Sequence, residues 1–354
     1  MFESNIRNLM FDLASNREIF DAEQDRVITK AEANDAIRKV CYEKLGLNEK
    51  STDKEIRRAL KKDSAMDLFE VIEEIIDLKI AAGISENEFF NQFVETKNMK
   101  DGDANEFWID NEVILNVAKV SGDHHDLLIQ RLGAGQSYSV PTAYYAVKVG
   151  GDIRLFLTGK RDWNTLVDAV AKAYVVKIQT ETFTQFVNGT NLYNPPSVLT
   201  GTGTLDATTK AQFDAIIEKV ESANEAPVVI MGTKTALKNL NALSAIPAVD
   251  WVAESQKEAI ANTGIIGSYE GVTLLQLPQK FTDKTLATPL IDNTKLFIMP
   301  LVSDNKPVKF VDYGESELEI NEVGGTVDDM QTYELQRRFG IATLMTRYYG
   351  VWTI

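Results

Sequence analysis

The chain has 354 residues, of which 44% are hydrophobic and 25% charged, the balance of a soluble globular protein large enough for two compact units. A formal net charge of −15 argues against an ordinary nucleic-acid binder, and only two histidines leave little for histidine-based acid–base chemistry. The single cysteine, Cys41, excludes disulfide bonds within the chain; it lies on an apolar helical face, so we expect it to be buried. No run approaches the length of a membrane span, and the start, MFESNIRNLM, does not resemble a secretory signal, so we expect a cytoplasmic product.

From Phe2 to about Ala82 the pattern of apolar residues is helical throughout. Up to residue 65 the charges balance, with 13 basic and 13 acidic side chains, so the excess of acid lies downstream. Breaks are expected near Asn16, between residues 46 and 53, and at Gly83. The strongest segment, residues 65–81, is predicted to be an amphipathic helix.

One motif in this region resembles a calcium-binding loop. Its spacing is that of an EF-hand, but the sixth position, where the loop requires glycine for a sharp turn, is Arg26. Thr29 and Glu32 also fit a capping box for the helix that follows. We therefore expect a helix cap rather than a calcium site. Positions one, three, five, eight and twelve of the motif are Asp21, Glu23, Asp25, Ile28 and Glu32.

A basic cluster lies in the helix expected to begin at Ser51 and Asp53. A solvated helix face explains it, because no aromatic residues are interleaved as in many single-strand-binding sites. Contact with a polyanion is the alternative. The cluster consists of Lys54, Arg57, Arg58, Lys61 and Lys62.

From residue 89 to 160, strand-like segments replace the helical pattern. Residues 107–120 form one such segment, and Ala143–Val149 and Asp152–Thr158 form a pair joined by Gly150-Gly151, a connection suited to a tight hairpin. The pattern indicates a two-stranded arm, which needs a neighbour to cover both faces. The polar segments 97–105 and 133–139 are expected to become ordered only against that neighbour.

Within this arm, residues 122–126 read Gly-Asp-His-His-Asp and invite interpretation as a metal site. His124 and His125 would point to opposite faces of a strand, and the chain has no third histidine. We therefore expect a polar loop here.

Residues 162–188 predict one long helix, because apolar residues recur at spacings of three and four with a step in phase after Ile178. Asp162 is placed to cap this helix and Gly189 to end it. Its length would be on the order of 40 Å. The apolar stripe comprises Trp163, Leu166, Val167, Val170, Tyr174, Ile178, Phe183, Phe186 and Val187.

The segment 194–204, with Asn194-Pro-Pro and Thr200-Gly-Thr-Gly-Thr, is interpreted as a linker because it lacks the third glycine of a dinucleotide-binding loop. Helices and strands then alternate up to about residue 300, which indicates a small α/β layer. The helices are expected at 205–223, 233–243 and 249–261, and the strands at 226–231, 271–277 and 295–299.

The tail returns to extended structure. In residues 315–320 the three glutamates at 315, 317 and 319 would face one way and Leu318 and Ile320 the other, and residues 332–354 are rich in β-branched and aromatic types. We find no nucleophile elbow, phosphate-binding loop or zinc-protease motif. We therefore predict no catalytic, cofactor-binding or metal-binding residues.

The order of these elements resembles that of the major capsid proteins of tailed double-stranded-DNA bacteriophages, whose Hong Kong ninety-seven type fold is shared by encapsulins. The likeness covers roughly residues 89–354. It is carried by Asn188-Gly-Thr after the long helix, by the segments 226–232 and 264–272, and by the C-terminal RYYGVWTI.

The resemblance implies an α+β fold built around a long spine helix. Residues 1–88 would be a helical N-terminal arm or an added subdomain, and residues 89–160 the extended (E) loop. The peripheral (P) domain would contain the spine helix at 161–199 and the strands and C-terminus at 301–354. Residues 200–300 would be the axial (A) domain.

By the same resemblance the protein is a structural subunit and not an enzyme. It would self-assemble as hexamers and pentamers of an icosahedral shell in the virion, form in the host cytoplasm and enclose the DNA genome. Implied partners are copies of itself and scaffold, portal and decoration proteins, with DNA contacted only by non-specific proximity and no membrane or cofactor. Two alternatives stay open: an encapsulin-type cellular shell, and a soluble α/β enzyme that binds a small anionic ligand at the Thr200–Thr204 loop.

Overall fold

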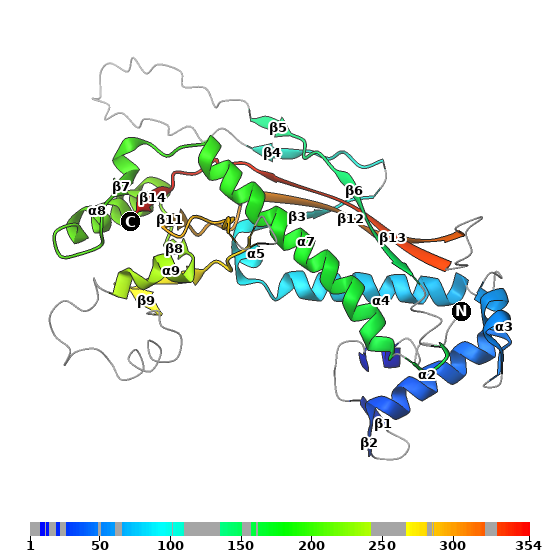
Figure 1. The fold of residues 1–354 in the computed structure, drawn as a ribbon. Coiled ribbons are helices and arrows are strands. Elements are labelled where there is room, and N and C mark those ends of the chain that lie inside the picture. Colours follow the sequence, from blue (N-terminus) through cyan, green and yellow to red (C-terminus); the bar gives the residue numbers. More distant parts are fainter. Residues whose placement is uncertain are drawn as a thin grey trace, which may run out of the picture.

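The computed structural model has an α+β architecture in which one long helix lies along a four-stranded sheet and ends near a six-stranded sheet (Figure 1). No helix in the described part of the chain is long and apolar enough to cross a membrane. The structure describes residues 8–10, 12–13, 19–21, 26–48, 51–60, 66–100, 102–109, 135–150, 157–160, 162–241, 267–281, 285, 287–322 and 331–354.

The long helix is confirmed as α7, Trp163–Leu192, with 30 residues. At 1.5 Å per residue it is about 45 Å long, and it runs beside α4, Met66–Ser85, across the four-stranded sheet (Figure 1). Its predicted apolar stripe is buried at Val167, Val170, Tyr174, Ile178, Phe183 and Phe186.

The helix begins where it was predicted to, but the roles of Asp162 and Gly189 need correction. Asp162 occupies the N-cap position, but its side chain makes no capping hydrogen bond. The helix passes through Gly189 and ends three residues later at Leu192. A Cβ atom at Gly189 would lie 2.3 Å from Cγ2 of Thr343, so the glycine permits close packing on a strand rather than ending the helix.

The four-stranded sheet has the order β3-β12-β13-β6. Its long central strands, β12 (Val308–Glu322) and β13 (Gln331–Thr343), are antiparallel, and a bulge interrupts their register between Asp312 and Ser316. The strands predicted in the tail are thus confirmed, although the glutamate side chains at 315–319 lie outside the described ones. On one edge β3 (Val94–Asn98) runs parallel to β12, and β6 (Ala143–Gly150) pairs with β13 on the other.

The predicted hairpin around Gly150-Gly151 falls on residues that the structure describes only in part. Gly150 belongs to β6 and pairs with Thr332, so β6 has β13 as its partner. Residues 151–156 lie outside the described part of the chain, while Leu157 and Thr158 adopt helical and turn conformations instead of continuing a strand. The structure therefore shows that β6 pairs with the distant strand β13, while the predicted turn at the two glycines stays a prediction.

The six-stranded sheet has the order β7-β14-β11-β8-β10-β9. Its centre is β8 (Val228–Gly232), every residue of which is buried, between β11 (Lys295–Pro300) and β10 (Val272–Gln276). These three strands confirm the predicted ones. The short strand β9 (Ser268–Tyr269) closes one edge.

Two segments of this sheet were assigned differently from the sequence. The predicted linker contains β7 (Thr200–Thr202), which pairs in parallel with β14 (Gly350–Thr353). Gly201 allows this because a Cβ atom there would lie 2.2 Å from the ring of Trp352. Consequently the last strand of the tail lies in the sheet of residues 200–300 and not beside β12 and β13.

Helix α8 (Lys210–Asn224) covers one face of the six-stranded sheet and begins five residues later than expected. The preceding turn is stabilised by Asp206, whose carboxylate accepts hydrogen bonds from the backbone of Thr208 and Thr209. Helix α9 (Lys234–Lys238) is capped by Thr233. The helix predicted at 249–261 lies outside the described residues.

The N-terminal region contains the helices α2 (Lys30–Leu45), α3 (Asp53–Leu60) and α4. The break at Gly46 is confirmed, since this residue ends α2 with a φ of 65°. Helix α4 passes through Gly83, where a Cβ atom would press on Val175 of α7, so this glycine also serves packing. The expectation of helix throughout was wrong at β1 (Ile19–Asp21) and β2 (Arg26–Ile28), which form an antiparallel pair.

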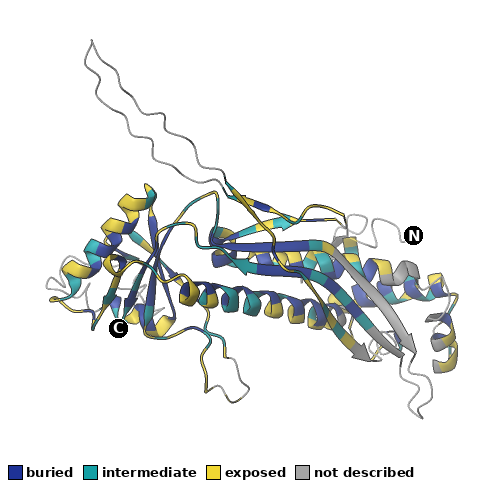
Figure 2. Ribbon diagram, turned by 90° about the horizontal axis from the view of Figure 1, so that it is seen from above, coloured by how far each residue is buried: buried dark blue, intermediate teal, exposed yellow. Residues whose placement is uncertain are grey.

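One continuous hydrophobic core joins the N-terminal helices, α7, the four-stranded sheet and one face of the six-stranded sheet. The ring centroids of Phe186 on α7 and Phe297 on β11 are 5.4 Å apart within it. A second core lies between the other face of the six-stranded sheet and α8. Figure 2 shows the buried residues concentrated along the inner strands of both sheets.

Candidate functional site

A two-stranded pair lies on the outer face of the four-stranded sheet, where β4 (Phe107–Ile109) and β5 (Gln136–Tyr138) are antiparallel. Phe107 is buried in a small cluster with Met99, Val140 and Val311. This cluster fixes the pair to β12, and residues 110–134 between the two strands lie outside the described structure. We call β4 and β5 the arm base.

Two lysines of the four-stranded sheet make cation–π contacts with the ring of Phe107. The Nζ atoms of Lys97 and Lys309 lie 5.7 and 5.4 Å from its centroid, within the range of cation–π attraction. Lys309 is almost completely buried and forms an ion pair with Glu95, its register partner on β3. Because a buried charge is tolerated only when it is paired, this arrangement fixes the position of the arm base.

The expectation that residues 97–105 become ordered only against a neighbour is not supported by the contacts of the single chain. Nζ of Lys97 donates to the carbonyl oxygens of Ala104 (3.1 Å) and Glu106 (2.9 Å). Asn105 donates to the carbonyl oxygen of Val140 at 2.6 Å. A turn with few apolar residues is therefore organised here by one lysine and one amide side chain.

The arm base presents aromatic side chains to solvent. Trp108 alternates with the buried Phe107 and is exposed, and its ring lies over the backbone of Gly135. Tyr138 and, on β6, Tyr144 are exposed as well. Exposed aromatic groups of this kind are typical of protein contacts.

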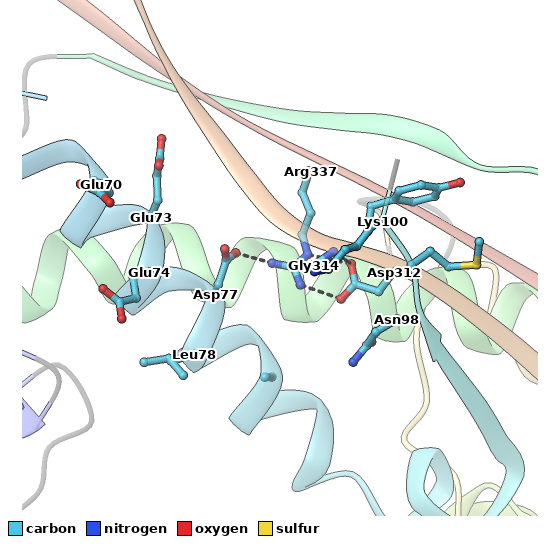
Figure 3. Close-up of a pocket in the computed structure, with 13 residues that line it drawn as sticks. Glu70, Glu73, Glu74, Asp77, Leu78, Asn98, Lys100, Asp312, Gly314 and Arg337 are labelled. Atoms are coloured by element: carbon cyan, nitrogen blue, oxygen red, sulfur yellow. Dashed lines mark hydrogen bonds and ion pairs between the residues drawn. The ribbon is translucent and has the colours of Figure 1, made fainter. Parts of the chain in front are cut away.

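A groove of about 930 Å³ lies between α4 and the four-stranded sheet (Figure 3). At its floor Arg337 on β13 forms ion pairs with Asp77 on α4 and Asp312 on β12. Figure 3 shows Glu70, Glu73 and Glu74 arranged along α4 beside this network. The charges at the floor are paired with one another, so the network joins the N-terminal helices to the sheet and offers no free base or nucleophile.

The EF-hand interpretation is replaced by the predicted helix cap. Thr29 and Glu32 form a complete capping box at the start of α2. Asp21 lies opposite Arg26 in the β1–β2 pair, with Ile28 in the second strand, whereas Glu23 and Asp25 lie outside the described residues.

Cys41 is buried as predicted, and burial raises the pKa of its thiol to about 12, so it is not a reactive nucleophile. Of the basic cluster, Lys54 and Arg58 are exposed on α3, while the side chains of the other members lie outside the described ones. His124 and His125 also lie outside. Among the described residues no group of three or more histidine, cysteine or acidic side chains could hold a metal ion.

The Thr200–Thr204 loop is engaged in the sheet and is not a free anion-binding loop. Residues 200–202 pair with β14, and the N–H of Gly203 donates to the carbonyl oxygen of Thr353 at 2.8 Å. The carbonyl oxygen of Gly203 accepts from Nε1 of Trp352 at 2.9 Å. This geometry removes the observation on which the enzyme alternative depended.

Neither Arg337 nor Lys309 was identified from the sequence, although the pattern around Arg337 contains a signal that could have found it. In β13 every second residue from Leu335 to Ile341 faces the helices, and Arg337 is the charged residue in that apolar series. A charge at an inward position of a period-two pattern predicts a buried partner. Its partners, Asp77 and Asp312, are 260 and 25 residues away and could not be chosen from the pattern.

Comparison with solved structures finds capsid proteins. The procapsid structure of satellite phage P4 with its size determination (Sid) protein shares 10% identity and a TM-score of 0.48, covering 78% of this chain and 89% of that chain. The mature capsid of bacteriophage PhiM1 gives 11% identity, a TM-score of 0.45 and coverages of 75% and 87%. The virus-like particle from Pyrococcus furiosus gives 14% identity, a TM-score of 0.40 and coverages of 79% and 98%.

No curated protein matches the chain. Because the structural scores are low, family membership depends on the sequence, and there one family model matches residues 5–353. Its description is "SPbeta prophage-derived putative capsid protein YonB". The chain belongs to this family of phage capsid proteins.

Proposed function

We propose that the chain is the main structural subunit of an icosahedral phage shell, which self-assembles as hexamers and pentamers and encloses a packaged DNA genome. The observation that carries this proposal is the capsid-family match along nearly the whole chain. The subunit's form agrees with it: a helix about 45 Å long is buried along one sheet, and an aromatic arm base projects from the other face of that sheet. A subunit built for assembly needs such outward apolar groups more than it needs a catalytic pocket.

We infer a fold of the Hong Kong ninety-seven type, with α7 as the spine of the P domain. The four-stranded sheet would form the rest of that domain and the six-stranded sheet the A domain. In this assignment the A domain includes residues 200–300 together with β14, and the arm base is the root of the E loop. Residues 1–88 would be an added helical subdomain rather than a detachable arm, because α2, α3 and α4 share the main core.

The net charge of −15 fits contact with packaged DNA by proximity only. Like charges repel, and at physiological salt the repulsion is screened beyond about 8 Å, so an acidic inner wall would not trap the polymer. Other copies of the chain are the principal partners, and scaffold, portal and decoration proteins would complete a virion assembled in the host cytoplasm.

Electron microscopy and sedimentation of the expressed protein test this function. We expect rings or closed shells, whereas a strictly monomeric species at high concentration would contradict the proposal. The content of purified particles separates the two kinds of shell. Nuclease-protected DNA in particles from infected or induced cells supports the viral shell, and particles that enclose a defined protein cargo without DNA would favour the encapsulin-type alternative.

A further inference from the structure

A second hollow lies far from the arm base, between the segment that follows α7, helix α8 and the turn before β14. Its volume is about 560 Å³. The short helix η2 (Ser197–Leu199) forms one wall, and the solvent-facing side of α8 forms the other. The α8 wall is shallow because it contains the small side chains of Ala215, Ser222 and Ala223. Val198 and Tyr348 stand at its rim. We call this hollow the α8 groove.

Large apolar side chains gather around the α8 groove although they are exposed. Of the residues that line the groove, Val198 is 62% exposed and Tyr348 is 56% exposed. Burying exposed side chains of this size removes apolar surface from water, which favours association. A chain that keeps two of them in solvent at one place has an unfilled contact surface there.

The backbone beneath these side chains is held firmly. The amide group of Asn224 donates to the carbonyl oxygen of Tyr348 (2.8 Å) and accepts from its N–H (3.2 Å). The next residue, Tyr349, donates to the carbonyl oxygen of Thr190 at 3.1 Å and so ties the turn to the end of α7. A contact residue held in place before binding loses little entropy on binding, which favours affinity.

The charges around the groove decide the kind of partner. Glu218 and Lys219 are its charged lining residues, and their charges cancel. A site for a basic partner should be surrounded by acidic side chains, and the lining of this groove has no excess of them. A second copy, itself carrying −15, would instead be repelled except where the contact surface is neutral and apolar.

We propose that the α8 groove is a docking site for a neighbouring copy of this chain, in addition to any contact made through the arm. This inference rests on the proposed shell function. In the hexamers and pentamers of that shell, contacts around a ring are heterologous, so the groove would meet a different surface on the next copy.

Photo-crosslinking of assembled particles identifies the occupant directly. With p-benzoylphenylalanine in place of Tyr348, we expect crosslinked peptides that join position 348 to a second copy of the chain. Crosslinks only to another protein, such as a scaffold or decoration protein, would overturn the proposal. So would an absence of intersubunit crosslinks in particles that form normally.

A matched pair of variants tests the energetic role. Val198→Asp should reduce the yield of assembled rings or shells at least tenfold while the soluble subunit keeps its melting temperature. Val176→Asp is the control, because Val176 is also exposed, at 40%, but lies on α7 away from the groove. Equal assembly by Val198→Asp and the unsubstituted protein, or an equal loss in both variants, would contradict a specific site. If the unsubstituted chain formed no particles at all, the shell function itself would fail, and a concentration-dependent dimer abolished by Val198→Asp would still support the groove.

Discussion

Arg337 and Asp312 form a bidentate ion pair between the two long strands of the four-stranded sheet, although they are not register partners. Nε of Arg337 lies 3.2 Å from Oδ1 of Asp312, and Nη2 lies 2.6 Å from Oδ2. The bulge between Asp312 and Ser316 makes this possible by shifting the register so that Arg337 pairs with Ser316. The remaining donor reaches Asp77 on α4, so one guanidinium group connects two strands and a helix.

Removing this guanidinium group should destabilise the subunit strongly. Arg337→Ala leaves the buried carboxylate of Asp312 without its partner, and the expected loss is about 3–5 kcal/mol in the free energy of unfolding, measured by urea titration. Arg337→Lys keeps the charge but loses the planar fork, so it should recover only part of the loss. Unchanged stability in Arg337→Ala would show that the pair is not formed in solution.

The buried tyrosines predict a loss of stability at high pH. Burial raises the pKa of Tyr174 and of Tyr349 to about 12, above the value of about 10 for an unfolded chain. The folded form therefore binds more protons in this range, so the stabilisation is complete below pH 10 and is lost as the pH rises through 12. Tyr174→Phe should flatten the decline measured by unfolding between pH 10 and 12, whereas Tyr144→Phe, at an exposed position, should leave its slope unchanged.

The apolar stripe of α7 gives a direct comparison between buried and exposed positions. The ring centroid of Phe186 lies 5.3 Å from that of Phe89 and 5.4 Å from that of Phe297. Phe186→Ala should therefore lower the free energy of unfolding by about 3–5 kcal/mol. Lys172→Ala, at an exposed position of the same helix, should change stability by less than about 0.5 kcal/mol. Thermal unfolding of the two variants checks this, and similar melting temperatures would mean that the stripe is not buried.

The elements that the sequence predicted well are those with a strong local pattern. The apolar stripe of α7, the period-two segment of β12 and the short apolar run of β8 are each recognisable over a few neighbouring residues, and the structure has a helix and two strands at these places. The capping box of Thr29 and Glu32 was also recognisable, because its two partners are three residues apart. Local chemistry decides these features, so one sequence is enough to see them.

The features that were missed depend on contacts distant in the sequence. The sequence around Gly189 suggests the end of a helix, but the glycine is needed because Thr343 packs against it. Gly201 was assigned to a linker, but it lies in a strand where the ring of Trp352 leaves no room for a Cβ atom. The candidate assembly surfaces could not be predicted because exposure of single residues such as Tyr348 is decided by the tertiary fold.

The turn beside the arm base should be protected even in free subunits. Lys97 closes this turn through the carbonyl oxygens of Ala104 and Glu106, so Lys97→Met should increase amide hydrogen exchange across residues 100–106 while β12 stays protected. Lys100→Met is the matched control, because the turn uses the backbone N–H of Lys100. Rapid exchange of this turn in the unsubstituted free subunit would contradict the observed arrangement.

The contact between Gly189 and Thr343 makes a prediction opposite in sign to the usual one. In an exposed helix, replacing glycine by alanine stabilises by about 0.5–1 kcal/mol. At Gly189 the new Cβ atom would lie 2.3 Å from Cγ2 and 2.7 Å from Cβ of Thr343, so Gly189→Ala should instead cost about 1–3 kcal/mol through overpacking.

A double-mutant cycle with Thr343→Gly isolates this clash, because removing the threonine side chain should make Gly189→Ala neutral or stabilising in that background. Gly83→Ala on α4 serves as the comparison, since its nearest obstacle, at 2.9 Å, is a terminal methyl group of Val175 that has more room to adjust. Denaturant unfolding of the four proteins of the cycle gives the coupling free energy. If Gly189→Ala lowered the free energy of unfolding as much with glycine at position 343 as with threonine, the loss would arise from the helix itself. The close packing of α7 on β13 would then not depend on Gly189.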